Sequence, residues 1–249
     1  MKIFTLLLAL AALLAITHAG YTNTTDFWRQ QLGYSEADMH FQGYAGILFI
    51  YSGFEEINWY RPAGQSHMFY ELFSSKGTDI MDQAVPLIIW LQGGPGGSSQ
   101  FGCFTEMGPI RIIDNKAKLF PYSWSTLGHM IFIDQPLNVG FSYYGERNST
   151  SQVSSANEAA EHLLNFMDNF YKTWPSLKKN PLYITGESFA GHYIPAFART
   201  IIMNSSWVES TGVKLSGVAI GDGWTDPVNQ FNYYDSLLYS AGIVSNKFR

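Results

Sequence analysis

Residues 181–193 read PLYITGESFAGHY, and this stretch predicts a sharp turn between a buried strand and a helix. The apolar run Leu182–Thr185 has the length and composition of a strand, and a helical pattern begins just after Ser188. Gly186 and Ala190 are small, as required where strand and helix backbones come close together. A serine at such a turn is exposed above the sheet, where it can act as a nucleophile. The pentapeptide alone fits a helix-capping serine equally well.

A glycine-rich segment supports the first of these interpretations. Residues 90–99 read WLQGGPGGSS and follow the apolar run Pro86–Leu91. Acyl transfer requires backbone N–H groups that point at the developing oxyanion. Hydrolases with a nucleophile turn take one from the residue after the nucleophile, here Phe189, and one from a loop of this kind, here Gly94. The segment lacks the lysine and the glycine spacing of phosphate-binding loops, which argues against a nucleotide site.

Six apolar runs predict strands, and helical patterns separate the later ones. The middle runs are continuously apolar, which is typical of strands buried on both faces. We expect the first two strands to form an antiparallel hairpin. The whole order predicts an α/β fold with a mixed, mostly parallel sheet flanked by helices. The strands are Gly46–Tyr51, His67–Phe73, Pro86–Leu91, Met130–Asp134, Leu182–Thr185 and Gly217–Gly221; the helices are Ser155–Thr173, a segment from just after Ser188 toward Met203, and Val228–Tyr239.

The N-terminus has the pattern of a signal peptide. Lys2 precedes the apolar run Ile3–Ile16, and the small residue Ala19 follows, so we expect cleavage of residues 1–19 and a domain over residues 20–249. An N-terminal membrane anchor is the alternative. No later stretch approaches the ~18 apolar residues of a membrane span. The formal net charge of −5 argues against nucleic acid or an anionic membrane as the main partner.

Three glycosylation sequons, at Asn23, Asn148 and Asn204, also fit a secretory route to the cell exterior or to a lysosome or vacuole. The single cysteine, Cys103, has aromatic neighbours in sequence and no evident activating group, so we do not expect a catalytic thiol.

Several segments together resemble the serine carboxypeptidase family, over roughly residues 26 to 249. The resemblance implies an α/β-hydrolase fold and a secreted or lysosomal enzyme that uses Ser188 to remove C-terminal residues from peptides or proteins. It implies no cofactor and no metal. The segments are WLQGGPGGSS (90–99), FTEMGP (104–109), IDQPLNVGFSY (133–143), GESFAGHY (186–193) and IGDGWTDP (220–227).

The resemblance also implies a site for the free C-terminal carboxylate of the substrate. Gln92 supplies the side-chain amide, Gly93 adds a backbone N–H, and Glu187 and Glu106 form a pair of acids beside them. Two carboxyl groups in contact cannot easily both ionise, so one pKa rises. A protonated Glu187 can then donate to the substrate, which predicts activity at acidic pH. The alternative for Glu106 is a structural acid in a turn.

Four positions depart from the family pattern. Gln92 stands where the family usually has asparagine, so its amide reaches about one bond length further. Gly97 stands where the family often has a cysteine, which excludes that disulfide. Phe189 replaces a tyrosine, and Asp222 stands where the family favours asparagine.

The general base is missing from the sequence. This fold uses the chain order serine, then acid, then histidine. Only His192 follows Ser188, and it lies four residues along the same helix, where its ring stacks along that helix. We expect His67 and His129 in loops or at sheet edges. The sequence therefore predicts a C-terminally incomplete domain, with the acid and the histidine beyond Arg249 and no peptidase activity in this chain alone.

Two other functions remain open. The chain fits a secreted, non-catalytic relative that binds peptide C-termini, and it fits an esterase or acyltransferase on the same fold. The sequence leaves the oligomeric state undetermined.

Overall fold

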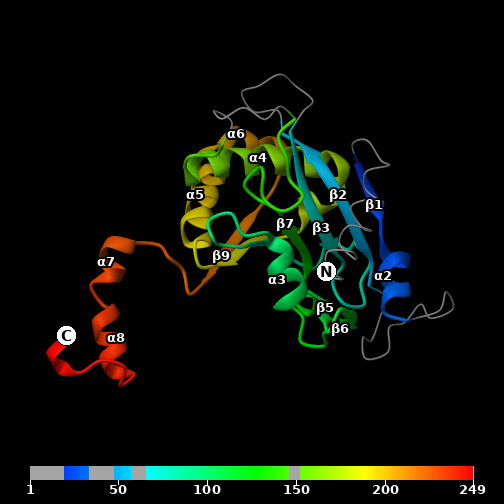
Figure 1. Cartoon of the computed structure of the whole chain (residues 1–249). Helices are drawn as coiled ribbons and strands as arrows, with labels where there is room; N and C mark the ends of the chain where they lie inside the picture. The colour runs from blue at the N-terminus through cyan, green and yellow to red at the C-terminus, as the bar shows by residue number, and fades with distance from the viewer. Residues whose placement is uncertain (1–19, 34–47, 58–65, 146–151, 249) are drawn as a thin grey trace.

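A computed structural model describes residues 20–33, 48–57, 66–145 and 152–248. Their central feature is a seven-stranded sheet in the order β1-β2-β3-β7-β4-β8-β9 (Figure 1). Strands β7, β4, β8 and β9 are parallel, and β3, β2 and β1 continue the sheet by antiparallel pairing. The strands are β1 (Gly20–Asn23), β2 (Ile50–Glu56), β3 (His67–Phe73), β4 (Leu87–Leu91), β7 (His129–Ile133), β8 (Leu182–Glu187) and β9 (Leu215–Gly221).

The sequence located most of these strands. The prediction for β3 is confirmed at both ends, those for β4, β7, β8 and β9 agree within two residues, and the β2–β3 hairpin is confirmed. The bounds Gly46–Tyr51 were wrong, because β2 begins at Ile50 and continues to Glu56. This strand buries the polar residues Ser52 and Glu55, so its second half has no apolar run to mark it.

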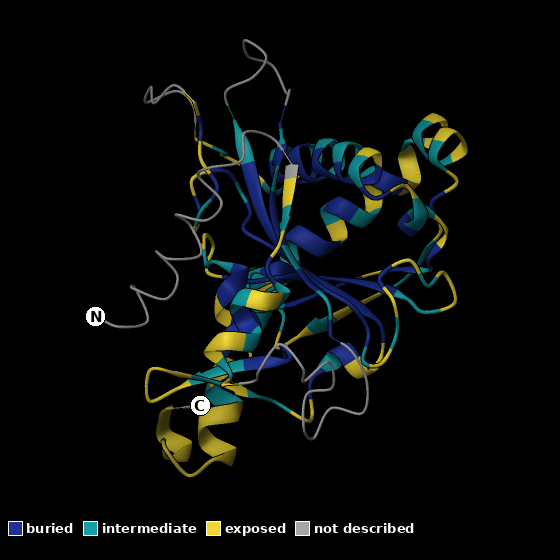
Figure 2. Cartoon of the chain, turned by 90° about the vertical axis from the view of Figure 1, so that its right-hand side faces the viewer, coloured by how far each residue is buried: buried dark blue, intermediate teal, exposed yellow. Residues whose placement is uncertain are grey.

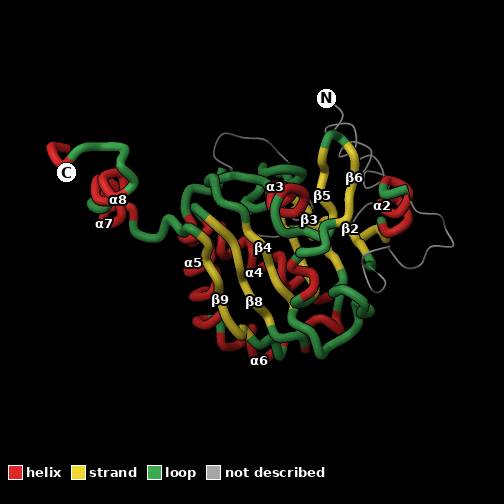
Figure 3. Tube along the Cα trace, turned by 90° about the horizontal axis from the view of Figure 1, so that it is seen from below, coloured by secondary structure: helices red, strands yellow, loops and turns green. Residues whose placement is uncertain are grey.

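Two layers cover the sheet, and β4 contributes to both. Leu87, Ile89 and Leu91 pack with α4 (Ala156–Thr173) and α5 (Ala190–Met203). Ile88 and Trp90 point the other way and pack with residues of α2 (Thr25–Gln31) and α3 (Ser99–Thr105). Figure 3 shows α4 and α5 together behind β4, β8 and β9. The central strands are dark blue in Figure 2, in agreement with the prediction of strands buried on both faces.

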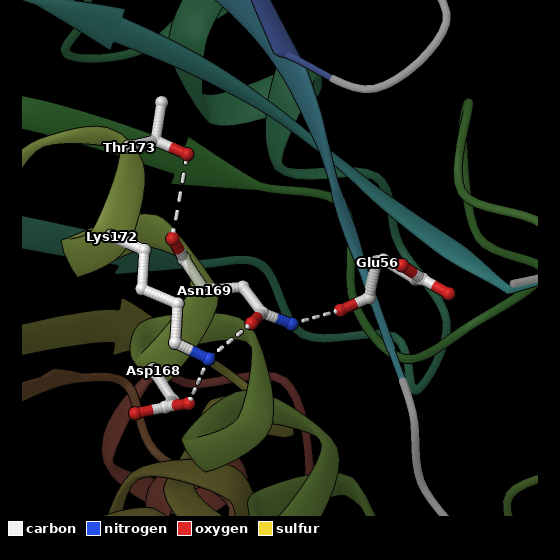
Figure 4. Close-up of polar contacts among 5 residues, drawn as sticks. All are labelled: Glu56, Asp168, Asn169, Lys172 and Thr173. Carbon is white, nitrogen blue, oxygen red and sulfur yellow. Dashed lines mark hydrogen bonds and ion pairs between the residues drawn. The ribbon is translucent and has the colours of Figure 1, made fainter. Parts of the chain in front are cut away.

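Helix α4 is fixed at both ends. The hydroxyl of Ser155 caps its N-terminus. Near its C-terminus, Asn169 Nδ2 donates to the main-chain oxygen of Glu56 in β2 at 2.5 Å. Lys172 Nζ donates to Asp168 Oδ2 at 2.6 Å and to Asn169 Oδ1 at 2.9 Å, which orients the Asn169 amide for that contact (Figure 4).

The C-terminal helix prediction, Val228–Tyr239, was wrong. The segment forms two short helices, α7 (Pro227–Phe231) and α8 (Tyr234–Ser240), which project away from the sheet (Figure 1). They are largely exposed, including apolar side chains such as Leu237 at 67% (Figure 2). The sequence also missed β1, α2, α3, the hairpin of β5 (Ile110–Ile113) and β6 (Lys116–Leu119), and α6 (Ser205–Thr211). Within the described ranges, no helix combines the length and apolar character that a membrane span needs.

Candidate active site

The turn between β8 and α5 contains the predicted nucleophile. Ser188 has a φ of +56°, a conformation that residues other than glycine seldom adopt. The end of β9 and the segment that follows it hold Ser188 there, since Ser188 N–H donates to Gly221 O at 3.0 Å and Trp224 N–H donates to Ser188 O at 2.8 Å. Such a conformation persists only where the surrounding structure fixes it. The sharp turn predicted from residues 181–193 is confirmed.

Glycines bring the surrounding backbone against this turn. A Cβ atom on Gly186 would lie 2.2 Å from Leu91 O, so β8 can approach β4 there only without a side chain. A Cβ atom on Gly93 would lie 2.6 Å from Phe189 N and 2.8 Å from Ser188 Cβ. The glycine-rich loop after β4 therefore touches the turn directly.

Two backbone amides at this junction have no partner within the described ranges. Neither Phe189 N–H nor Gly94 N–H donates a hydrogen bond to any residue placed there. Gly94 has a φ of +121°, and Gly97 N–H donates to Gly93 O at 2.8 Å, so the loop turns tightly at this point. The arrangement leaves both amides able to bind a ligand oxygen.

Gln92 and Glu187 meet beside the turn. Gln92 Nε2 donates to Glu187 Oε1 at 2.6 Å, and Trp90 Nε1 donates to Gln92 Oε1 at 2.9 Å. The indole donor identifies the oxygen end of the amide, so the NH₂ group faces Glu187. Gln92 is 8% exposed, and its side chain is thus held in one position although it is longer than the asparagine of the family pattern.

Two of the departures from the family pattern are neighbours in space. A Cβ atom on Gly97 would lie 3.1 Å from Gln92 Cγ and 2.9 Å from Gly93 O. The loop therefore packs closely against Gln92 and Gly93, and position 97 has no room for a side chain in this conformation.

Glu106, at the C-terminal end of α3, completes the acidic pair. Burial raises its pKa, the nearby carboxyl of Glu187 raises it further, and Asp222 adds to the effect. Arg111 opposes this rise, and its guanidinium donates to the main-chain oxygen of Glu106. The raised pKa of Glu106 agrees with the expectation that one pKa of this acidic pair rises.

Asp134 anchors the glycine-rich loop, a contact that sequence reasoning missed. Its buried carboxylate accepts from Ser98 Oγ at 2.6 Å and from Phe141 N–H at 3.0 Å. A Cβ atom on Gly140 would lie only 2.0 Å from Asp134 Oδ2, so this approach requires glycine. Burial raises the pKa of Asp134 to about 6, and the hydrogen bonds oppose the rise. The sequence feature that could have indicated this contact is a charged residue directly after a strand predicted to be buried.

His192 does not contact the serine hydroxyl. Its ring packs against Phe189 at 4.7 Å and Trp224 at 6.0 Å, measured between ring centroids. Across the described segments, no histidine forms a hydrogen bond with Ser188 Oγ, and no cluster of three or more His, Cys, Asp or Glu side chains could hold a metal ion.

The expectation of a loop or edge position was wrong for His129. It is fully buried in β7, between β3 and β4. Its Nδ1 accepts from Ser75 N–H at 2.8 Å and its Nε2 donates to Asp82 O at 3.1 Å, while burial lowers its pKa. His67 is also a strand residue, half-buried in β3. Both histidines therefore belong to the sheet and have a structural role.

The remaining predicted sites lie away from the turn. Asn23 is exposed, Asn204 is half-buried at the start of α6, and Asn148 and the signal peptide lie outside the described residues. Cys103 is buried in α3, and burial raises the pKa of its thiol well above the usual value.

Comparisons with known proteins agree with this geometry. The family model for serine carboxypeptidases matches residues 42–248. Carboxypeptidase Y of Komagataella phaffii is 40% identical over 193 residues, which cover 77% of this chain and 34% of that protein. Vitellogenic carboxypeptidase of Aedes aegypti is 41% identical over 197 residues, which cover 78% of this chain and 39% of that protein.

A solved structure gives the same result. The prohormone-processing carboxypeptidase Kex1 of Saccharomyces cerevisiae superimposes with a TM-score of 0.69 and 29% identity, over 80% of this chain and 43% of that one. The chain thus spans between a third and two fifths of the length of the curated relatives named above. On the family model, the identities and the α/β-hydrolase fold, the chain belongs to the serine carboxypeptidase family.

Proposed function

We propose that this chain carries the nucleophile and the carboxylate-binding site of a serine-type carboxypeptidase. The whole enzyme would release C-terminal residues from peptides and proteins at acidic pH. The observation that carries the proposal is the contact of Gln92 with Glu187, one residue before a serine held at φ +56°. A side-chain amide and an acidic pair that can hold a proton, beside a nucleophile, suit a substrate that ends in a free carboxylate.

Each group has a defined part in the reaction. Ser188 Oγ attacks the carbonyl carbon of the last peptide bond, and the amides of Phe189 and Gly94 bind the oxyanion. The acyl group remains on Oγ while the C–N bond breaks and the leaving amine gains a proton. Gln92 and Gly93 N–H bind the terminal carboxylate.

The acidic pair makes this binding dependent on pH. A substrate carboxylate adds negative charge beside Glu106 and Glu187, so the site binds it best when the pair holds a proton. Because the pKa of Glu106 is raised, that condition is met at acidic pH.

The proton on Ser188 Oγ needs a base, and the chain offers none that matches the family order. Removal of the base eliminates most of the rate of such enzymes. We therefore propose that the 249-residue chain alone binds peptide C-termini but does not hydrolyse them at a useful rate.

The proposed location is the secretory pathway, with the cell exterior or an acidic lysosome or vacuole as destination. The signal-peptide pattern of residues 1–19 and the sequons support it. An acidic destination also agrees with the raised pKa of Glu106.

Calorimetric binding tests the proposal. We expect an N-acetylated peptide with a free C-terminus to bind at about pH 5 at least ~10-fold more tightly than its C-terminal amide, since the amide cannot take the charged hydrogen bonds. Gln92→Ala should remove this preference. Equal affinity for the two peptides would reject a carboxypeptidase site and favour an esterase or acyltransferase, for which a short-chain ester is the matched probe.

A further inference from the structure

A pocket of about 290 Å³ lies between α4, α5 and α6, away from the active site. Ser188 precedes the first residue of α5, whereas Thr200 and Asn204 lie at its other end. The 14 residues of this helix separate the two sites by about 20 Å. The polar groups of the lining belong to Glu161, Asn165, Asp168, Thr200, Asn204 and Trp207.

Trp207 gives this pocket an aromatic wall. It lines the pocket, and its ring contacts the ring of Tyr171 at 6.4 Å between centroids. The half-buried indole ring also offers an apolar surface on which a flat ligand can pack.

The lining carries the carboxylates of Glu161 and Asp168 and the amides of Asn165 and Asn204. Asp168 already pairs with Lys172 at 2.6 Å, and Lys172 also contacts Asn169, as Figure 4 shows. Carboxylate and amide side chains can bind hydroxyl and amide groups, and an aromatic ring can pack against the C–H face of a sugar. This combination therefore suits a sugar. The volume lies at the small end of ligand pockets, ~300 Å³, and suits a single ring.

Asn204 links the pocket to a possible site of N-glycosylation. It begins the sequon Asn204-Ser205-Ser206 and lines the pocket. Its Oδ1 accepts from Trp207 N–H at 3.2 Å and from Ser206 Oγ at 3.1 Å. Its Nδ2 donates to none of the described residues, and Nδ2 is the atom to which an oligosaccharide is joined in such sequons.

We propose that the pocket holds the first N-acetylglucosamine of an oligosaccharide attached to Asn204. Nδ2 forms a bond to C1 of a sugar delivered by a lipid-linked diphosphate donor; the C1–O bond breaks, the lipid diphosphate leaves, and the amide loses one proton. The sugar ring packs on Trp207, and its polar groups meet the Asp168 carboxylate. Attachment keeps the local concentration of the sugar high, so individually weak contacts suffice. The inference rests on the proposed secretory route and is independent of the peptidase chemistry.

The test begins with the chain secreted from a glycosylating eukaryotic host. Mass spectrometry of the peptide that contains Asn204 reports its modification. Thermal unfolding is then measured for the native chain, Ser206→Ala, Trp207→Leu and the double variant. Ser206→Ala removes the sequon but retains Asn204 as the cap of α6. We expect the glycan to raise Tm by about 2–4 °C when Trp207 is present and by less than half of that when it is leucine.

Trimming supplies a measurement that needs no variant. An endoglycosidase that leaves one N-acetylglucosamine should preserve the gain in Tm, because only the first sugar occupies the pocket. An unmodified Asn204, equal gains with tryptophan and leucine, or loss of the gain on trimming would each overturn the proposal. Saturable binding of free N-acetylglucosamine by a chain whose Asn204 is unmodified would assign the pocket to a soluble sugar instead.

Discussion

Glu71 gives this chain a stability that depends steeply on pH. It lies in the middle of β3, opposite Ser52 of β2 and Phe132 of β7, and is fully buried. Neither carboxyl oxygen has a hydrogen-bond partner among the described residues. Burial raises its pKa from 4.5 to about 8; the carboxyl of Asp134 adds to this effect, and the hydroxyl of Ser52 opposes it.

The direction of the pH effect on stability depends on which state, folded or unfolded, binds the proton more tightly. A raised pKa means that the folded state binds the proton better than the unfolded state, so its contribution is complete below about pH 4.5 and is lost as the pH rises through about 8. At ~1.4 kcal/mol for each pH unit, ionisation of Glu71 in the unfolded state lowers the free energy of unfolding by about 4 kcal/mol near pH 7.5 and about 1 kcal/mol near pH 5. The expected difference is about 3 kcal/mol.

Glu71→Gln isolates this contribution. The amide has nearly the same shape and cannot ionise, so we expect the variant to lose about 3 kcal/mol of the pH dependence and to exceed the native chain in stability near pH 7.5. Urea unfolding at the two pH values measures both quantities. Glu209→Gln, on the exposed surface of α6, controls for the change in net charge. A native chain that is equally stable at both pH values, or a Glu71→Gln variant with the native slope, would refute the reasoning.

Further predictions concern the glycine-rich loop and the thiol behind it. Gly97→Ala should weaken binding of a free-acid peptide about tenfold, because its Cβ would crowd Gly93 O and Gln92 Cγ and so displace two groups of the proposed carboxylate site; an unchanged affinity would contradict this close packing. Ser98→Ala removes a helix cap and a donor to Asp134, so it should lower the free energy of unfolding by about 1–2 kcal/mol, with Ser98→Thr as the control. Cys103 should react with a thiol reagent only as fast as the chain unfolds, and rapid labelling of the folded chain would disprove its burial.

Other buried carboxyl groups act in the same direction as Glu71. Burial raises the pKa of Glu55 to about 7 and that of Asp134 to about 6. Both therefore favour the folded state at acidic pH, by the same linkage. A chain with this set of acids is better suited to an acidic compartment than to a neutral one, which agrees with the proposed destination.

The sequence predicted the parts of the fold that depend on local composition. Continuous apolar runs gave the central strands because these are buried on both faces, and the small residues around Ser188 gave the turn. Strand β2 was misplaced since the residues that it buries include Ser52 and Glu55, and the partner of Ser52, Thr24, comes from another segment. Burial of a polar residue is decided by tertiary contacts, which no local pattern reports.

The active-site residues were found by motif, but their arrangement depends on pairing between strands. The register that places Leu91 opposite Gly186 brings Gln92 to Glu187 across 95 positions of the sequence. The close approach of Gly97 to Gln92 and Gly93 appears only once the loop is folded. The raised pKa of Glu106 likewise depends on burial, which the sequence does not express.

The contacts of Asp134 determine how the loop beside the nucleophile can move. Its carboxylate binds Ser98 of that loop, and its main-chain oxygen accepts from Ser142 Oγ at 2.5 Å, while the same hydroxyl accepts from Phe69 N–H in β3 at 2.8 Å. The loop, the segment after β7 and the sheet thus share one network, so none of them opens alone. In amide hydrogen exchange, Phe141 N–H should therefore exchange through global unfolding and not through a local fluctuation. We therefore expect the loop beside Ser188 to open only as fast as the whole sheet unfolds.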